Sequence, residues 1–219
     1  MIRFLKVVVF LACLVPLGLL LWGFFGAAPF DMTTWGAGLG ANPIERITHA
    51  TGDWTLRLLL ITLSITPLRK LLNVPSLIRF RRMLGLFAFF YGSLHLMTYV
   101  WLDKFFAVHE MLADIAKRPF ITVGLTAFVL MVPLALTSTK GWIRRLGGKR
   151  WQALHRLIYF SAIAGVIHYL WLVKADTRKP LEYGAVLLLL LSYRVGVWLL
   201  PLLGKRRTVP VARTPAAAE

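Results

Sequence analysis

Three histidines lie inside long apolar stretches of the chain. His95 falls in the run Met83–Leu102, and His155 and His168 both fall in the run Trp151–Val173. An ionisable side chain within hydrocarbon is costly, so it usually has a partner or a function, and an imidazole nitrogen is a common metal ligand. These three side chains are therefore the first candidates for chemistry.

The spacing of His155 and His168 suits ligands near both faces of a membrane. Thirteen residues separate them, which is about 20 Å along a helix axis and leaves the two side chains about 140° apart around it. One helix could therefore offer a ligand near each face, directed toward different neighbours.

The composition places the chain among integral membrane proteins. Hydrophobic residues make up 58% of its 219 residues and charged residues only 16%, whereas soluble domains average roughly 25% charged residues. The length allows about six spanning helices of roughly 20 residues each. We expect an all-α bundle of six transmembrane helices in a single domain, residues 1–204, followed by a basic, disordered cytoplasmic tail over residues 205–219.

Six apolar runs are the expected spans. The first has 19 apolar residues, more than the roughly 7–15 of a signal peptide, so we expect it to be retained. The second is short and contains Arg57, which we expect to snorkel to the interface rather than to meet a buried anion. The runs are Val7–Phe25, Trp54–Leu68, Met83–Leu102, Phe120–Thr137, Trp151–Val173 and Leu181–Leu203.

The connections between these runs alternate in charge. Gly26–Asp53 is rich in Gly, Pro and turn formers, which predicts a loop with at most a short interfacial helix over Ile44–Thr51. Asp103–Arg118 is a polar loop, whereas Arg69–Arg82 and Ser138–Arg150 are basic loops.

The distribution of charge predicts the orientation. Sixteen Lys and Arg residues fall on the side of the two termini and seven on the opposite side, so the positive-inside rule places both termini in the cytoplasm. The net charge of +17 is therefore a topology signal, and we expect no nucleic-acid partner. Eight of the nine acidic residues fall on the outer side or at its edge, which gives a mixed-charge surface able to dock a soluble partner.

His95 and His168 are expected to lie at one depth. Each precedes an aspartate by eight residues, Asp103 and Asp176 respectively, and eight residues span about 12 Å of helix. In this topology their helices run in the same direction. This geometry suits bis-histidine ligation of a haem iron between two facing helices.

His155 has no facing histidine in this register. The residue of the third span at its depth is Arg82, near the inner face. Arg156 beside it could hold a haem propionate or a flavin phosphate, or it could simply snorkel. His49 and His109 fall in outer loops, where a solvated histidine is the default.

Several familiar chemistries have no motif here. The chain contains no CxxC, no HExxH, no Gly-rich phosphate loop after a strand and no nucleophile elbow. Nicotinamide binding is therefore not expected, and electrons must come from another molecule.

Five stretches of the chain carry a resemblance to a known family. They are GANPIERITHATG (Gly40–Gly52), LLLITLSITPLRK (Leu58–Lys70), RRMLGLFAFFYGSLH (Arg81–His95), KRPFITVG (Lys117–Gly124) and KRWQALHRLIYFSAIAGVIHYLWLVKAD (Lys149–Asp176). In order and spacing the chain resembles the MsrQ family, formerly YedZ, of haem-binding membrane subunits within the ferric-reductase-like transmembrane family. The resemblance covers roughly Leu39–Leu200.

The resemblance implies a six-helix b-type cytochrome of the bacterial inner membrane that binds haem b and FMN. It implies electron transfer to MsrP, a soluble periplasmic molybdopterin enzyme that reduces methionine sulfoxide in oxidised envelope proteins. The chain would then be a redox subunit rather than the catalytic one, with a cytoplasmic flavin reductase or quinol as donor. The family's haem-linked histidines map onto His95, His155 and His168.

Two other classes of function remain open on the sequence. A small transporter or proton conductor could relay protons through the histidines. The absence of buried carboxylates from the spans and of an evident inverted repeat weighs against it. A passive membrane anchor for MsrP would need only the outer loops.

Overall fold

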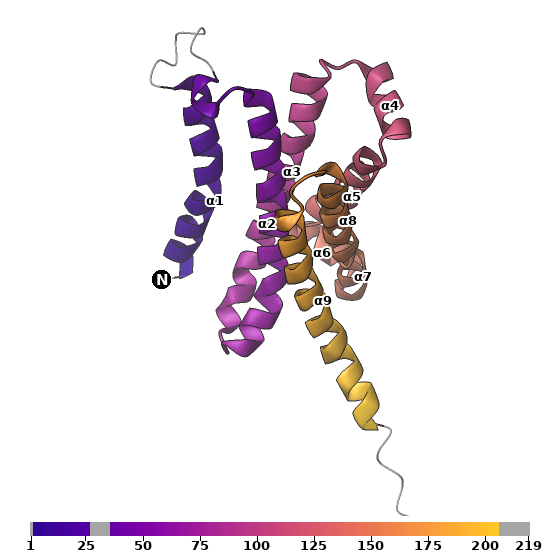
Figure 1. The fold of residues 1–219 in the computed structure, drawn as a ribbon. Coiled ribbons are helices and arrows are strands. Elements are labelled where there is room, and N and C mark those ends of the chain that lie inside the picture. The colour runs from indigo at the N-terminus through magenta and orange to yellow at the C-terminus, as the bar shows by residue number, and fades with distance from the viewer. Residues whose placement is uncertain (1, 27–35, 206–219) are drawn as a thin grey trace, which may run out of the picture.

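The structure is a computed structural model that describes residues 2–26 and 36–205. Every regular element in these residues is helical (Figure 1). The long helices are α1 (Ile2–Phe25), α2 (Pro43–Leu71), α3 (Ile78–Met97), α5 (Pro119–Leu136), α8 (Leu157–Leu172) and α9 (Arg178–Lys205). The short elements are η2 (Ala37–Leu39), η3 (Pro75–Leu77), the π-helical turn η4 (Thr98–Asp103), α4 (Val108–Lys117), α6 (Lys140–Leu146) and α7 (Gly148–Leu154).

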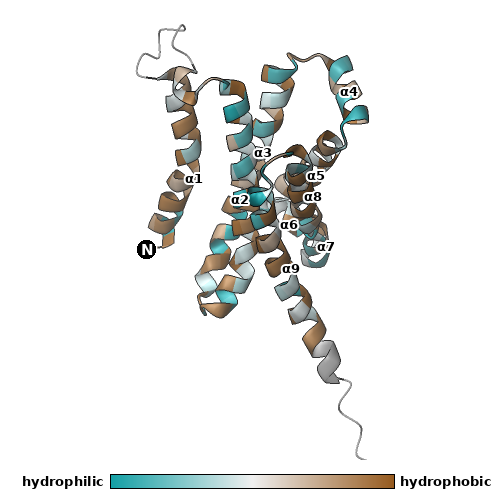
Figure 2. Cartoon of the chain, viewed as in Figure 1, coloured by the Kyte–Doolittle hydropathy of each residue, from teal (hydrophilic) through white to brown (hydrophobic). Residues whose placement is uncertain are grey.

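The all-α membrane class is confirmed. In the described ranges five helical stretches are long and apolar enough to cross a membrane, namely Ile2–Phe25, Pro75–Asp103, Pro119–Leu136, Gly148–Leu172 and Arg178–Leu200. Figure 2 shows hydrophobic residues along α1, α5 and α8 and hydrophilic positions on α4. The predicted tail over residues 205–219 lies outside the described residues except for Lys205.

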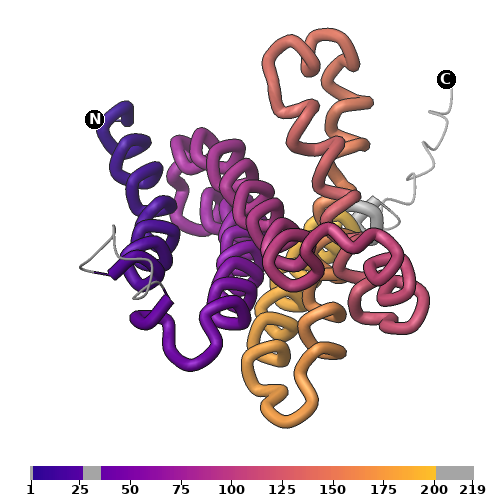
Figure 3. The backbone as a smooth tube through the Cα atoms, turned by 90° about the horizontal axis from the view of Figure 1, so that it is seen from above, coloured from indigo at the N-terminus to yellow at the C-terminus, as the bar shows by residue number. Residues whose placement is uncertain are grey.

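Of the six long helices, only α2 is not among these five stretches, and it is the least apolar because it carries Asp53, Arg57 and several threonines. It packs along α3 and also contacts α1, α8 and α9 (Figure 3). Its Leu59 and Leu63 are 2% and 1% exposed. Protein rather than lipid therefore surrounds much of α2, and polar side chains in a span are tolerated where they face the bundle.

The second helix begins at Pro43, eleven residues before the predicted Trp54. The prediction of a loop over Gly26–Asp53 is therefore wrong for its last eleven residues. Asn42 is the N-cap, because its side-chain oxygen accepts from the Glu45 N–H at 3.2 Å, and proline fits the first helical position. Residues 43–53 are instead the first turns of α2, so the predicted short helix Ile44–Thr51 is part of that long helix and not a separate element.

The other predicted loops also contain helix. The polar loop Asp103–Arg118 holds α4, and the basic loop Ser138–Arg150 holds α6 and the start of α7. The predicted span Trp151–Val173 is divided at His155 and Arg156, where Arg156 N–H bonds to the Ala153 carbonyl three residues back. The division places His155 at a tight turn rather than in a regular helix.

The helix directions agree with the predicted topology. The first residues of α1 and the last of α9 lie on the same side of the bundle, and α4 lies on the opposite side (Figure 1). Consequently α3 and α8 run in the same direction, toward α4.

Tyr91 ties α1 to α3. It is fully buried, donates a hydrogen bond to the Cys13 carbonyl at 2.7 Å and accepts one from the Leu17 N–H at 3.1 Å. These two backbone groups are the i, i+4 pair of α1 around Pro16. The hydroxyl is thus inserted into the hydrogen-bond ladder of α1 at its proline, which fixes where α1 meets the bundle.

Candidate functional site

His95 of α3 and His168 of α8 face each other. Their ring centroids are 6.0 Å apart and their planes meet at 76°. The two residues are 73 positions apart in the sequence. Their helices run in the same direction within the bundle, where α3 packs on α2 and α5, and α8 packs on α5. The prediction that they lie at one depth is confirmed.

Both imidazoles are held in the same tautomer by backbone carbonyls. His95 Nδ1 is 2.9 Å from the Thr48 carbonyl of α2, and His168 Nδ1 is 2.7 Å from the Phe120 carbonyl of α5. A carbonyl oxygen can only accept, so each Nδ1 carries the proton and donates it. Each Nε2 therefore presents a lone pair, which is the state that a metal ligand needs.

A glycine on the neighbouring helix makes room for each ring. A Cβ placed on Gly52 would lie 3.0 Å from His95 Cε1, and one on Gly124 would lie 2.6 Å from His168 Nδ1. Each glycine follows by four residues the carbonyl that its histidine bonds. Each imidazole is therefore supported in the same way, by a backbone carbonyl and a glycine four residues later on the neighbouring helix, which is α2 for His95 and α5 for His168.

The two histidines line a cavity of about 730 Å³ enclosed by α2, α3, α4, α5 and α8. Its size lies within the roughly 300–1,000 Å³ typical of small-molecule and cofactor sites. Most of the wall is apolar, including Leu59, Leu96, Leu125, Phe128 and Met131, while Asn42, Glu45, Asp103 and Arg118 lie toward the end near α4. The cavity is therefore apolar beside the histidines and polar at its outer end.

The geometry fits an iron between the two rings. A metal–imidazole nitrogen bond is about 2 Å, and each coordinating nitrogen is about 1 Å from its ring centroid, so two ligands on opposite sides of a metal have centroids about 6 Å apart. The observed 6.0 Å agrees. With two Nε2 lone pairs, a mostly apolar wall and charged residues toward α4, His95 and His168 could hold a haem, which would supply one-electron chemistry there.

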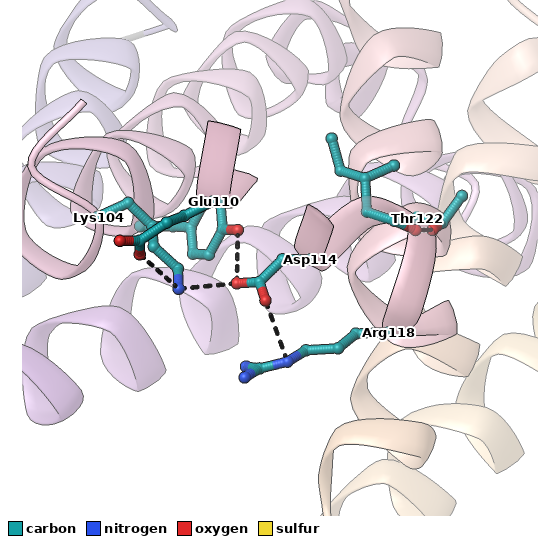
Figure 4. A network of polar contacts seen from close by, with 7 residues as sticks. Lys104, Glu110, Asp114, Arg118 and Thr122 are labelled. Atoms are coloured by element: carbon teal, nitrogen blue, oxygen red, sulfur yellow. Dashed lines mark hydrogen bonds and ion pairs between the residues drawn. The ribbon is translucent and has the colours of Figure 1, made fainter. Parts of the chain in front are cut away.

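A polar network holds α4 over the outer end of the cavity (Figure 4). Asp114 is 8% exposed and pairs with Lys104 at 2.9 Å and with Arg118 at 3.3 Å. The Tyr99 hydroxyl donates to Asp114 at 3.1 Å. The hydrogen bond from Lys104 is the main reason that the pKa of the Asp114 carboxyl lies below its ordinary value. Arg118 lines the cavity with its side chain half exposed, so a cation is present at the mouth.

Asp53 and Arg57 correct two interpretations of the sequence. Arg57 does not simply snorkel, because it pairs with Asp53 at 2.7 Å and donates to the Tyr183 hydroxyl of α9 at 2.8 Å. Tyr183 in turn donates to Asp53 at 2.8 Å. The Asp53 side chain is 17% exposed and lines the cavity. A part-buried carboxylate therefore lies within α2, one residue before the predicted span Trp54–Leu68.

His155 lies apart from this cavity, toward the other side of the bundle. Its ring stacks on Trp151 at 3.9 Å, and its Nδ1 donates to the Trp151 carbonyl at 3.0 Å. Within the described residues its Nε2 is buried without a hydrogen-bond partner. Its electrostatic neighbour on α3 is Arg81, which is adjacent to Arg82, the residue expected at the depth of His155. One residue turns a helix by about 100°, so the depth count could not decide which of the two side chains is directed toward His155.

The other three candidate residues from the sequence, Arg156, His49 and His109, have exposed side chains. Arg156 follows His155 with an exposed side chain and does not line the cavity of His95 and His168. His49 is exposed at the mouth of that cavity, and His109 is exposed on α4.

The residues that support the two histidines were not predicted from the sequence. They are Thr48 and Gly52 on α2, and Phe120 and Gly124 on α5. A signal was present, since two of the five quoted stretches, GANPIERITHATG and KRPFITVG, end on these glycines within helices.

Comparison with known proteins gives consistent matches. The family described as ferric reductase like transmembrane component matches residues 51–166. A protein of Herminiimonas arsenicoxydans is 55% identical over 192 residues, 87% of this chain and 84% of that protein. Proteins of Azospira oryzae (59% over 162 residues, 74% and 70%) and Caulobacter vibrioides (50% over 188 residues, 85% and 84%) are also similar. All three are named protein-methionine-sulfoxide reductase heme-binding subunit MsrQ.

Proposed function

Because the chain belongs to the MsrQ family of haem-binding subunits, within the ferric-reductase-like transmembrane family, we propose that it is a b-type cytochrome of the bacterial inner membrane. In this proposal it passes electrons to a periplasmic, MsrP-like molybdopterin reductase that repairs methionine sulfoxide in envelope proteins. The chain itself holds and tunes the redox group and does not carry out the reduction of the sulfoxide.

The facing pair His95 and His168 carries the proposal. Two imidazoles 6.0 Å apart, each with Nδ1 committed to a carbonyl, leave two Nε2 lone pairs for one metal. A bound haem b would supply one-electron chemistry there. The carbonyls of Thr48 and Phe120 orient the rings and raise their basicity as ligands, and the apolar wall lowers the local dielectric, which together set the reduction potential.

The inner end of the bundle supports a second redox site around His155. The His155 Nε2 is buried and has no hydrogen-bond partner in residues 2–26 and 36–205, so it is a nitrogen available to a ligand, and Arg81 places a cation nearby. We propose that the second group, a further haem or the FMN, lies here, with Arg156 as a candidate for an anionic substituent. A cytoplasmic flavin reductase or quinol would be the electron donor at this end.

The orientation of the protein in the membrane is inferred from the distribution of Lys and Arg. With sixteen Lys and Arg on the side of the termini and seven opposite, the cavity of His95 and His168 opens toward the periplasm. Electrons would then enter near His155 and leave near α4, whose mixed charges face the partner.

The spectrum of the purified protein tests the haem. We expect a Soret band that shifts on reduction with dithionite. The variants His95→Ala and His168→Ala should each lose most of that haem, since one remaining nitrogen gives no second ligand. His109→Ala is the matched control, because His109 is exposed on α4. A protein without a Soret band, or a ligand variant with normal haem content, would contradict the assignment.

Electron transfer needs its own experiment. Dithionite-reduced protein, freed of excess reductant, should reoxidise when MsrP and a methionine sulfoxide substrate are added together, and not with either alone. A passive anchor predicts no reoxidation. A proton conductor predicts pH changes in proteoliposomes, which would be measured on the same preparation.

A further inference from the structure

A groove of about 520 Å³ runs between α1 and α3 on the side of the bundle that holds the chain's first residues. One wall is a stripe of α1 at every fourth residue, Lys6, Phe10 and Leu14. A helix presents residues four apart on one face, so these three side chains line the groove together. The other wall is the facing stripe of α3.

Along α3 the residue types follow the same order as along α1, with cations first and apolar side chains after them. The stripe of α3 begins with Arg79 and Arg82 and continues with apolar side chains that include Leu86, Phe87 and Phe90. Since α1 and α3 both run away from this side, the cations of both walls gather at one end of the groove and the apolar side chains follow. The groove therefore has a charged head and an apolar body.

The charged head has no ion-pair partner among the residues that the structure describes. No acidic residue lines the groove, and none of the ion pairs found in residues 2–26 and 36–205 involves Lys6, Arg79 or Arg82. All three side chains are exposed. Three cations on one short patch repel one another, so an anion bound there would be stabilised by all three.

The depth of the groove matches one leaflet of a bilayer. Arg79 and Phe90 are eleven residues apart, about 16 Å of helix axis, and half of a hydrocarbon core of about 30 Å is about 15 Å. The apolar body closes around Phe10 and Phe87, whose rings meet edge-on at 5.1 Å. Phe10 remains 46% exposed, so the groove is open to lipid along its length.

We propose that this groove binds an anionic glycerophospholipid of the cytoplasmic leaflet. The phosphate lies among Lys6, Arg79 and Arg82, and an acyl chain follows Phe10 and Phe87 toward the middle of the membrane. Basic pockets between helices on the cytoplasmic side are the typical sites for such headgroups. A quinone fits less well, because its neutral ring would leave the three cations without a counter-charge.

Native mass spectrometry of the detergent-purified protein with added phosphatidylglycerol or phosphatidylcholine tests this proposal. Retention of phosphatidylglycerol should exceed that of phosphatidylcholine. It should fall about 100-fold in the triple variant Lys6→Gln, Arg79→Gln, Arg82→Gln, since each of the three cations contributes about 1 kcal/mol to headgroup binding. The control is Lys140→Gln, Arg144→Gln, Lys149→Gln, which removes the same charge from another loop on the same side and should retain the lipid.

A second variant tests the apolar body without changing the charge. Leu86 lines the groove, so Leu86→Trp should fill the path of the acyl chain and reduce lipid retention. Inorganic phosphate should not displace the lipid from the unchanged protein, because it has no acyl chain to bind the apolar body. The haem spectrum of each variant reports that the bundle has folded. Equal losses in the groove and control triple variants, equal retention of the two lipids, or displacement of the bound lipid by ubiquinone would each overturn the proposal.

Discussion

The glycine behind each histidine gives the sharpest test of the haem site. Replacing Gly124 by Ala would put a methyl group 2.6 Å from His168 Nδ1, and the Gly52→Ala methyl would lie 3.0 Å from His95 Cε1. Ordinary contacts of a Cβ begin near 3.4 Å. The ring of His168 must therefore move by about 0.8 Å and that of His95 by about 0.4 Å, if the backbone stays in place.

The larger movement disrupts two interactions at once. The Nδ1 of His168 is only 2.7 Å from the Phe120 carbonyl, so pushing the ring away weakens the hydrogen bond that orients it. Functional groups need positioning within about 0.5 Å, and losing a supporting contact of a metal ligand costs about 10–100-fold in affinity. We expect Gly124→Ala to lower haem affinity within that range and Gly52→Ala to lower it less than tenfold.

The assay is the haem content per protein after detergent washing, together with the reduction potential. Gly196→Ala is the matched control, because a Cβ at Gly196 of α9 meets nothing within 4 Å. Alanine should also favour each helix slightly, so a loss of haem cannot come from weaker helix formation. If Gly124→Ala binds haem like the unchanged protein, or if Gly52→Ala is the more damaging, the assignment of these glycines is wrong.

Two further predictions concern other parts of the bundle. Tyr91→Phe leaves the Cys13 carbonyl and the Leu17 N–H without their bridge, which should cost about 1–3 kcal/mol and lower the thermal midpoint in detergent while haem content is kept; an unchanged midpoint would contradict the role of the hydroxyl. Asp114 has a pKa below its ordinary 3.8, so its ion pairs stabilise α4 at neutral pH and are lost only as pH falls through that lowered pKa. Hydrogen exchange of α4 should therefore show no loosening between pH 8 and about pH 5, whereas Asp114→Asn should speed it throughout; loosening already at pH 6 would refute this.

The depth of the two principal histidines could be predicted from the chain because it depends on little more than counting. A fixed rise per residue and alternating helix directions place His95 and His168 at one level once Asp103 and Asp176 are taken as helix ends. The class of the fold followed from composition for a similar reason, since hydrocarbon accepts only helices and closed barrels.

What the sequence left open depends on the rotation of each helix about its axis and on its neighbours. Arg81 is the electrostatic neighbour of His155, although it differs by one position from Arg82 at the expected depth. Asp53 and Arg57 pair within α2, and only the approach of α9 adds the Tyr183 hydroxyl, which bonds to both.

The sequence by itself determined the membrane class, the approximate positions of most long helices and the level of the two histidines, because hydrophobicity and helix rise are properties of the chain. Only the tertiary structure decided that Thr48 and Phe120 fix the tautomers and that Gly52 and Gly124 admit the rings. Those contacts join α2 to α3 and α5 to α8, and a backbone carbonyl becomes a specific partner only when another helix approaches it.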